Sequence, residues 1–208
     1  MRKILIINNS FIPVQIVLGN EKGVLFSIKE NPPSKYPNNI IFIIQQFFNA
    51  FHMKPGEISE VAVAVGPGSF TGTRISVVEG KILAFALNIP LITINSLDII
   101  GKEIKKGFAA IFAGRMEVFI AEFEDGKRKS EDRCVPLNEA IKIENLFFPS
   151  REEAEKSKIP NAKFVEISAN TLLTIAYEKI EKGNFTKDPL SANPVYLRST
   201  DIIFRKRK

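Results

Sequence analysis

The sequence has one cysteine, one histidine and no tryptophan. The lone Cys134 cannot form an internal disulfide, which favours a reducing compartment. A single imidazole, His52, cannot supply the two or more histidines of a typical metal site, and any serine or cysteine nucleophile would have to use it. Because His52 falls at the end of a predicted helix, we interpret it as structural or solvent-facing. The sequence therefore predicts neither a metal site nor a catalytic residue.

Long apolar runs are missing too. No stretch approaches the roughly 20 apolar residues that cross a bilayer. Residues 1–11 carry a short apolar run without a small-residue cleavage site, which is typical of a first strand and not of a signal peptide. We expect a soluble, cytoplasmic protein without membrane contact.

The charge balance is basic. The 208 residues carry 29 Lys and Arg against 23 Asp and Glu, a net charge of +6, and the pI is near 9.4. This balance is compatible with RNA contact without requiring it. Basic residues are scattered except at 205–208, which form either a solvated, frayed tail or a weak phosphate contact.

The first hundred residues have the order of a ribonuclease-H-like unit. Three strands separated by short turns must form antiparallel hairpins, because a parallel return needs a crossover of about a dozen residues. Helices and strands then alternate. The predicted strands are 4–7, 13–18, 24–28, 61–65 and 91–94, and the predicted helices are 38–53, 74–87 and 96–105, the last with a serine cap at Ser96.

The pattern restarts near residue 106, as an abbreviated copy of the first half. Residues 138–162 are charged and broken by prolines, and no element is assigned there. The predicted strands are 108–112, 118–123, 133–137 and 164–167, followed by a helix at 168–182. Actin-like folds consist of two ribonuclease-H-like units. We therefore predict an actin-like α/β fold with two mixed sheets and with subdomains at 1–104 and 105–208.

A glycine-rich turn precedes the helix at 74–87. Glycines let the backbone approach a ligand, and a helix N-terminus offers free N–H groups with partial positive charge. The turn is not a Walker A loop, because Thr73 and Arg74 follow its last glycine. It is either a phosphate- or nucleotide-binding loop or a tight turn shaped by glycine and proline. The candidate loop residues are Gly66, Gly68, Ser69, Thr71, Gly72 and Arg74.

Three segments carry a resemblance to a known family. Residues 66–75 read Gly-Pro-Gly-Ser-Phe-Thr-Gly-Thr-Arg-Ile, and with 84–91 and 96–97 they closely resemble the hallmark segment of the TsaB (YeaZ) family. Residues 115–119 resemble that family's second-half strand motif, and 194–198 resemble its C-terminal signature. The resemblance spans nearly the whole chain.

The resemblance implies a two-subdomain actin-like fold and a role without catalysis of its own. Proteins of this family pair with the larger TsaD subunit, which carries the metal and transfers threonylcarbamoyl to adenosine 37 of tRNAs that read ANN codons. A small ATPase, TsaE, joins the bacterial complex. The implied role is a scaffold that activates TsaD, meets tRNA through the complex and needs no cofactor.

The chain departs from the family pattern at three places. The first strand ends in Asn8 and Asn9, where this family and actin-like ATPases commonly place an aspartate near nucleotide-bound Mg²⁺. Amides lack the charge that holds Mg²⁺. Phe112 stands where an acidic residue often precedes the second-half motif, and Met116 replaces its glycine. These departures leave the predicted fold intact and argue against an inherited nucleotide site.

Residues 40–51 form an apolar segment without a charged residue. At about 100° per residue, most of its large side chains gather on one broad face. The helix is either fully buried, or it packs on the core and also presents apolar surface to another subunit. We expect the second arrangement, with a homodimer in isolation and a heterocomplex with TsaD. The predicted interface residues are Ile40, Ile41, Ile44, Phe47, Phe48 and Phe51.

Two other functions remain open at this point. A weak nucleotide-binding actin-like ATPase or a glycoprotease-related enzyme would need a metal cluster or an acid–base pair, and none is visible in the sequence. An autonomous RNA-binding protein would need a clustered basic face with interleaved aromatics. The phenylalanines instead fall mostly in predicted strands and in the apolar helix.

Overall fold

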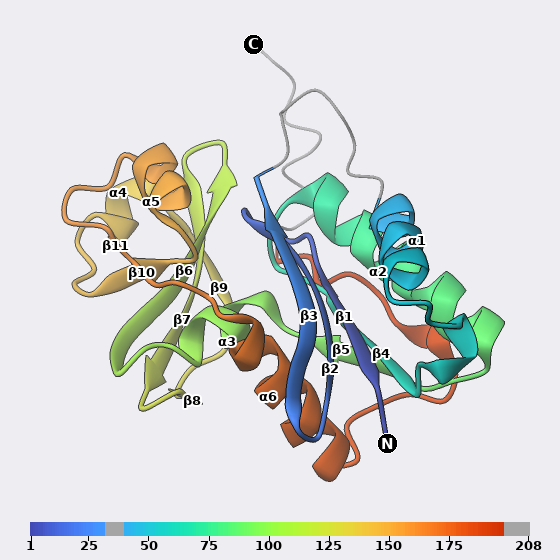
Figure 1. Cartoon of the computed structure of the whole chain (residues 1–208). Coiled ribbons are helices and arrows are strands. Elements are labelled where there is room, and N and C mark those ends of the chain that lie inside the picture. Colours follow the sequence, from blue (N-terminus) through green and yellow to red (C-terminus); the bar gives the residue numbers. More distant parts are fainter. Residues whose placement is uncertain (32–39, 198–208) are drawn as a thin grey trace.

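The computed structural model describes residues 1–31 and 40–197 and contains two mixed β-sheets side by side (Figure 1). The first sheet has the strand order β3-β2-β1-β4-β5. The first three strands pair antiparallel, and β4 and β5 add in parallel to β1. Its strands are β1 (Ile4–Asn8), β2 (Val14–Asn20), β3 (Gly23–Glu30), β4 (Glu60–Ala64) and β5 (Leu91–Ile94).

Both faces of the first sheet are covered. Helices α1 (Ile40–Ala50) and α2 (Phe70–Leu87) lie on one face, and α6 (Ala169–Glu181) lies on the other. Strand β4 is apolar after Glu60, because Val61 packs toward α2 and Ala62 packs toward the opposite core. A strand buried on both faces needs a continuous apolar run.

The second sheet repeats the strand order of the first. β6 pairs antiparallel with β7, β7 pairs antiparallel with β8 and β9, and β10 and β11 add in parallel beyond β6. Its strands are β6 (Lys106–Gly114), β7 (Glu117–Glu124), β8 (Lys127–Arg128), β9 (Arg133–Pro136), β10 (Leu146–Phe148) and β11 (Lys163–Phe164). The strands after β7 are short, so the predicted abbreviated copy is confirmed.

Two helices are exchanged between the halves. Helix α3 (Ser96–Gly101) follows the first sheet but packs on β6 and β7 of the second. Helix α6 follows the second sheet but packs on β1, β2, β3 and β5 of the first. Figure 1 shows both helices between the two sheets. One apolar core therefore runs through both halves, with residues of both sheets and both helices.

The smaller elements complete the second half. Helices α4 (Leu137–Ala140) and α5 (Arg151–Ser157) flank β10, in the stretch to which the sequence assigned no element. Short 3₁₀ turns lie at Pro55–Glu57 (η1) and Pro189–Ser191 (η2). Elements of two to seven residues are too short to show a helical or strand period, so their existence depends on pairing with distant strands.

Three predicted helix bounds need correction. α1 ends at Ala50, because His52 adopts the left-handed conformation with φ of 50° and the N–H of Met53 donates to the carbonyl of Phe48 at 2.9 Å. Residues 38–39 of that prediction lie outside the described part. α2 begins at Phe70 and not at Arg74. α3 ends at Gly101 and not at residue 105, and it is capped by Asn95 and not by Ser96, since the Asn95 side chain accepts from the N–H of Leu97 at 2.8 Å.

Candidate functional site

The glycine-rich segment is partly loop and partly helix. Ser69 caps α2 and accepts a hydrogen bond from the N–H of Gly72 at 3.2 Å. Thr71, Gly72 and Arg74 therefore belong to the first turns of α2, and Gly66 to Gly68 form the turn that follows β4. A serine one residue before a helix is among the best N-caps. Ser69 therefore marks the beginning of α2 in the sequence itself.

The glycines of this segment pack against the corner that follows β1. A Cβ at Gly68 would lie 2.1 Å from the carbonyl oxygen of Ser10, and one at Gly72 would lie 2.0 Å from that of Asn9. The N–H of Ser69 also donates to the Ser10 carbonyl at 2.7 Å. Close backbone approach therefore requires glycine at both positions. Occupation of this loop by a phosphate or nucleotide remains a hypothesis.

The corner itself is a buried polar network. The side-chain oxygen of Asn8 accepts from the hydroxyl of Ser10 at 2.7 Å, and Ser96 donates its hydroxyl to that of Ser10 at 2.7 Å. The N–H of Ser96 donates to the Gly66 carbonyl at 2.8 Å. Ser96, predicted as a helix cap, thus joins β1, the glycine-rich turn and α3.

Arg74 lies on the outer side of α2 and joins two of the family-like motifs. Its guanidinium lies 3.6 Å from the ring centroid of Phe70, and its Nε donates to the hydroxyl of Tyr196 at 2.7 Å. The N–H of Val195 donates to the carbonyl of Val65 at 2.7 Å, which places the C-terminal segment beside α2. Arg198 and the basic run at 205–208 lie outside the described residues.

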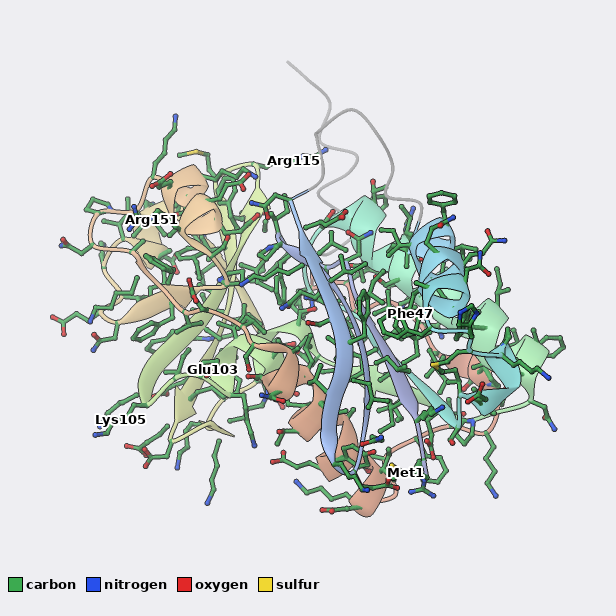
Figure 2. The ribbon with its side chains drawn as sticks, in the orientation of Figure 1. Met1, Phe47, Glu103, Lys105, Arg115 and Arg151 are labelled. Atoms are coloured by element: carbon green, nitrogen blue, oxygen red, sulfur yellow. The ribbon has the colours of Figure 1, made fainter. Side chains whose placement is uncertain are left out.

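Helix α1 is more deeply buried than the sequence suggested. Ile40, Ile44 and Phe47, three of the predicted interface residues, lie in the core of this chain and are at most 5% exposed. Phe47, labelled in Figure 2, stacks on Phe26 of β3 with ring centroids 4.6 Å apart. A partner could reach only the rest of the predicted set: Ile41 is 40% exposed, Phe48 is partly buried and Phe51 is 51% exposed.

Helix α2 carries an exposed apolar stripe that the sequence reasoning missed. The stripe consists of Phe70, Val78, Ile82 and Phe85, which are 52% to 64% exposed. The spacing of 78, 82 and 85 puts these side chains on one face. We call the stripe together with Ile41 and Phe48 the α1/α2 face. The spacing of these apolar residues is visible in the sequence. The buried side of α2 could not be identified from it, because that side consists mostly of small residues.

One carboxyl group lies between α1 and α2. Glu79 accepts a hydrogen bond from the backbone N–H of Ile41 in the first turn of α1, which has no acidic residue of its own. Burial raises the pKa of the Glu79 carboxyl to about 7, because its apolar surroundings disfavour the charged form. Sequence reasoning did not single out this residue.

The described residues were compared with the requirements of a metal site and of a membrane-spanning helix. Across residues 1–31 and 40–197, no group of three or more histidine, cysteine, aspartate or glutamate side chains could hold a metal ion. His52 is exposed at the turn after α1. Within the same described residues, no helix has the length and apolar character that crossing a membrane requires.

The fold defines the class of protein. The solved structure of YeaZ from Pseudomonas aeruginosa superposes with a TM-score of 0.76 over 95% of this chain and 100% of that chain, at 21% identity. A likeness at this identity establishes the fold and not the function. Together with the repeated strand order, it shows that the chain has an actin-like α/β fold.

Sequence comparison gives the family. A family model described as "TsaD: tRNA N6-adenosine threonylcarbamoyltransferase" matches residues 33–188. The Escherichia coli (strain K12) "tRNA threonylcarbamoyladenosine biosynthesis protein TsaB" is 29% identical over 95% of both chains. The protein of the same description from Bacillus subtilis (strain 168) is 42% identical over 55 residues, which are 26% of this chain and 24% of that one. The chain belongs to this family, among its TsaB (YeaZ) members.

Proposed function

We propose that this chain is the non-catalytic partner subunit of a TsaD-type threonylcarbamoyltransferase, and that it supports formation of N6-threonylcarbamoyladenosine at position 37 of tRNAs that read ANN codons. Membership of the TsaB (YeaZ) family supports the pathway. The exposed apolar side chains of the α1/α2 face are the observation that carries the partner role, because large apolar side chains gathered on an exposed face mark protein interaction sites.

The α1/α2 face is suited to an apolar partner surface. Fully burying a large aliphatic or aromatic side chain contributes about 1.5–3 kcal/mol. Val78, Ile82 and Phe85 are 52% to 64% exposed in this chain, so an added subunit gains at most a little over half of that for each. A TsaD-type subunit is the proposed occupant, since the family model that matches this chain describes such enzymes. In isolation, a second copy of this chain would use the same face.

The proposed role as a partner subunit also implies contacts with TsaE and tRNA. We propose that the small ATPase TsaE joins the complex, that tRNA is met through the complex, and that the protein is cytoplasmic. The single imidazole, His52, is exposed and lies at a turn outside the α1/α2 face, which supports a subunit that leaves the chemistry to its partner.

A docking experiment tests the α1/α2 face directly. Ile82→Glu places a charge in the middle of the stripe, and Ile141→Glu is the matched control, because Ile141 is similarly exposed, at 47%, on the second half of the chain. Light scattering and calorimetry with the purified TsaD-type subunit should show at least tenfold weaker binding for Ile82→Glu and unchanged binding for Ile141→Glu. Equal binding by both variants would contradict the proposed face.

A reconstitution tests the function itself. The purified chain is combined with the TsaD-type subunit, TsaE, threonylcarbamoyl-adenylate and tRNA, and each component is omitted in turn. We expect modified adenosine only when this chain and the TsaD-type subunit are both present. Full modification without this chain, or turnover by this chain alone, would overturn the proposal.

A third experiment tests the glycine-rich loop. The backbone of Asn9 and Ser10 already lies against Gly68 and Gly72, which supports a packing role. We therefore expect no heat when ADP or ATP is titrated into the isolated chain, with or without Mg²⁺. Saturable binding that disappears in Arg74→Ala would instead favour the nucleotide-loop hypothesis.

A further inference from the structure

Glu79 lies between residues of the α1/α2 face and is partly buried. Its neighbours Val78 and Ile82 are exposed members of the apolar stripe, and Ile41 of α1 donates its backbone N–H to the carboxyl group. The Oε2 atom is buried and makes no hydrogen bond to any residue that the structure describes. Buried carboxylate oxygens are normally paired, so an unpaired one is costly while the group is ionised.

The described surroundings offer no compensating cation. Arg74 and Lys81 are on the same helix, but offsets of five and two residues turn them away from Glu79, and Arg74 is engaged with Tyr196. Glu60 lies at the start of β4, where Arg2 pairs with it at 2.9 Å. Asp188 caps η2. Strands β1 and β5 and helix α1 carry no ionisable side chain.

A partner that covers Val78, Ile82 and Ile41 would remove the remaining water from Glu79. The ionised carboxylate would then lose solvation without gaining an ion pair, whereas the neutral carboxyl group would lose little. We propose that docking on the α1/α2 face is proton-linked through Glu79, and that the partner surface opposite this residue is apolar and brings no basic side chain. This inference rests on the proposed function.

The protonation state of Glu79 in the free chain determines the direction and the size of the pH effect on affinity. With a pKa of about 7, the carboxyl group is about half ionised at pH 7 in the free chain, so association takes up about half a proton there. If only the protonated form docks, affinity falls as pH rises. Between pH 6 and pH 8 the expected loss of affinity is about tenfold.

The test compares the wild-type chain with Glu79→Gln in binding to the purified TsaD-type subunit. Glutamine keeps an oxygen that can accept the N–H of Ile41, but it does not titrate. Calorimetry at pH 7 in phosphate and in Tris, whose ionisation enthalpies differ, measures the protons taken up. Glu181→Gln, an exposed position at the end of α6, is the control. Thermal unfolding of each variant at pH 6 verifies the fold.

We expect uptake of about half a proton by the wild type and by Glu181→Gln, and none by Glu79→Gln. The affinity of Glu79→Gln should change less than twofold between pH 6 and pH 8. Binding of the wild type without proton uptake overturns this inference alone. Affinity that rises with pH also overturns it, because it shows a basic partner residue opposite Glu79. No binding by the wild type at any pH overturns the proposed function as well.

Discussion

Replacement of Gly72 by alanine tests why the glycine-rich segment contains glycine. Gly72 lies in the first turn of α2, where alanine by itself would favour the helix by up to about 1 kcal/mol. In this chain the added Cβ would lie 2.0 Å from the carbonyl oxygen of Asn9. A backbone carbonyl cannot swing away as a flexible side chain can, so β1 or the start of α2 has to move.

The balance of these two effects gives the expected magnitude. Overpacking a tight contact costs about 1–3 kcal/mol, and a backbone overlap of this size belongs at the upper end. After subtraction of the gain in helix propensity, Gly72→Ala should lower the free energy of unfolding by about 2 kcal/mol. For a chain of this length, the corresponding fall in Tm is about 4–8 °C.

Chemical denaturation of Gly72→Ala and Gly56→Ala measures the effect. Gly56 is the control, because a Cβ there meets nothing within 4 Å, and its replacement should change stability by less than about 0.5 kcal/mol. If Gly72→Ala proves as stable as Gly56→Ala, close packing does not explain the glycine. The loop would then need glycine for another reason, such as close approach of a ligand.

Three further predictions concern stability. Phe51→Glu should cost about 1–2 kcal/mol in denaturation experiments, because Phe51 packs on the rings of Phe26 and Phe47; an unchanged value would contradict this packing. Because the pKa of Glu79 is raised on folding, its stabilising effect is complete at low pH and is lost as pH rises through about 7. Wild type should therefore lose stability relative to Glu79→Gln between pH 6 and pH 8, by less than about 1.4 kcal/mol after allowance for solvent screening. Separately expressed halves, 1–104 and 105–208, should show little native circular dichroism alone; a folded half would contradict the shared core.

The sequence predicted the first sheet well, because its signals are local. The short turns around 8–13 and 19–23 allow only hairpins, and the apolar run near 61–65 has the pattern of a strand covered on both faces. The strand order of the first sheet follows from these elements and from right-handed crossovers. The subdomain boundary at 104 and 105 remains a prediction.

The candidate site was less predictable, because it depends on contacts between distant segments. A helical period identified the apolar face of α1, but not that Ile40, Ile44 and Phe47 would face the chain's own core. Arg74 and Tyr196 belong to motifs more than a hundred residues apart, and only the folded chain brings them within 2.7 Å. Glu79 belongs to no recognised motif, and only the folded structure shows that it is partly buried beside α1.

The exchange of α3 and α6 explains how a chain with two sheets can give the proposed docking surface a firm base. Each helix covers the sheet of the other half, so the two halves share one apolar core and cannot separate without exposing both sheets. One face of the first sheet is left to α1 and α2, and α2 is also contacted by the 3₁₀ turn η2. A rigid base under α2 keeps Val78, Ile82 and Phe85 in fixed positions, and preorganisation of this kind lowers the entropy cost of binding a partner.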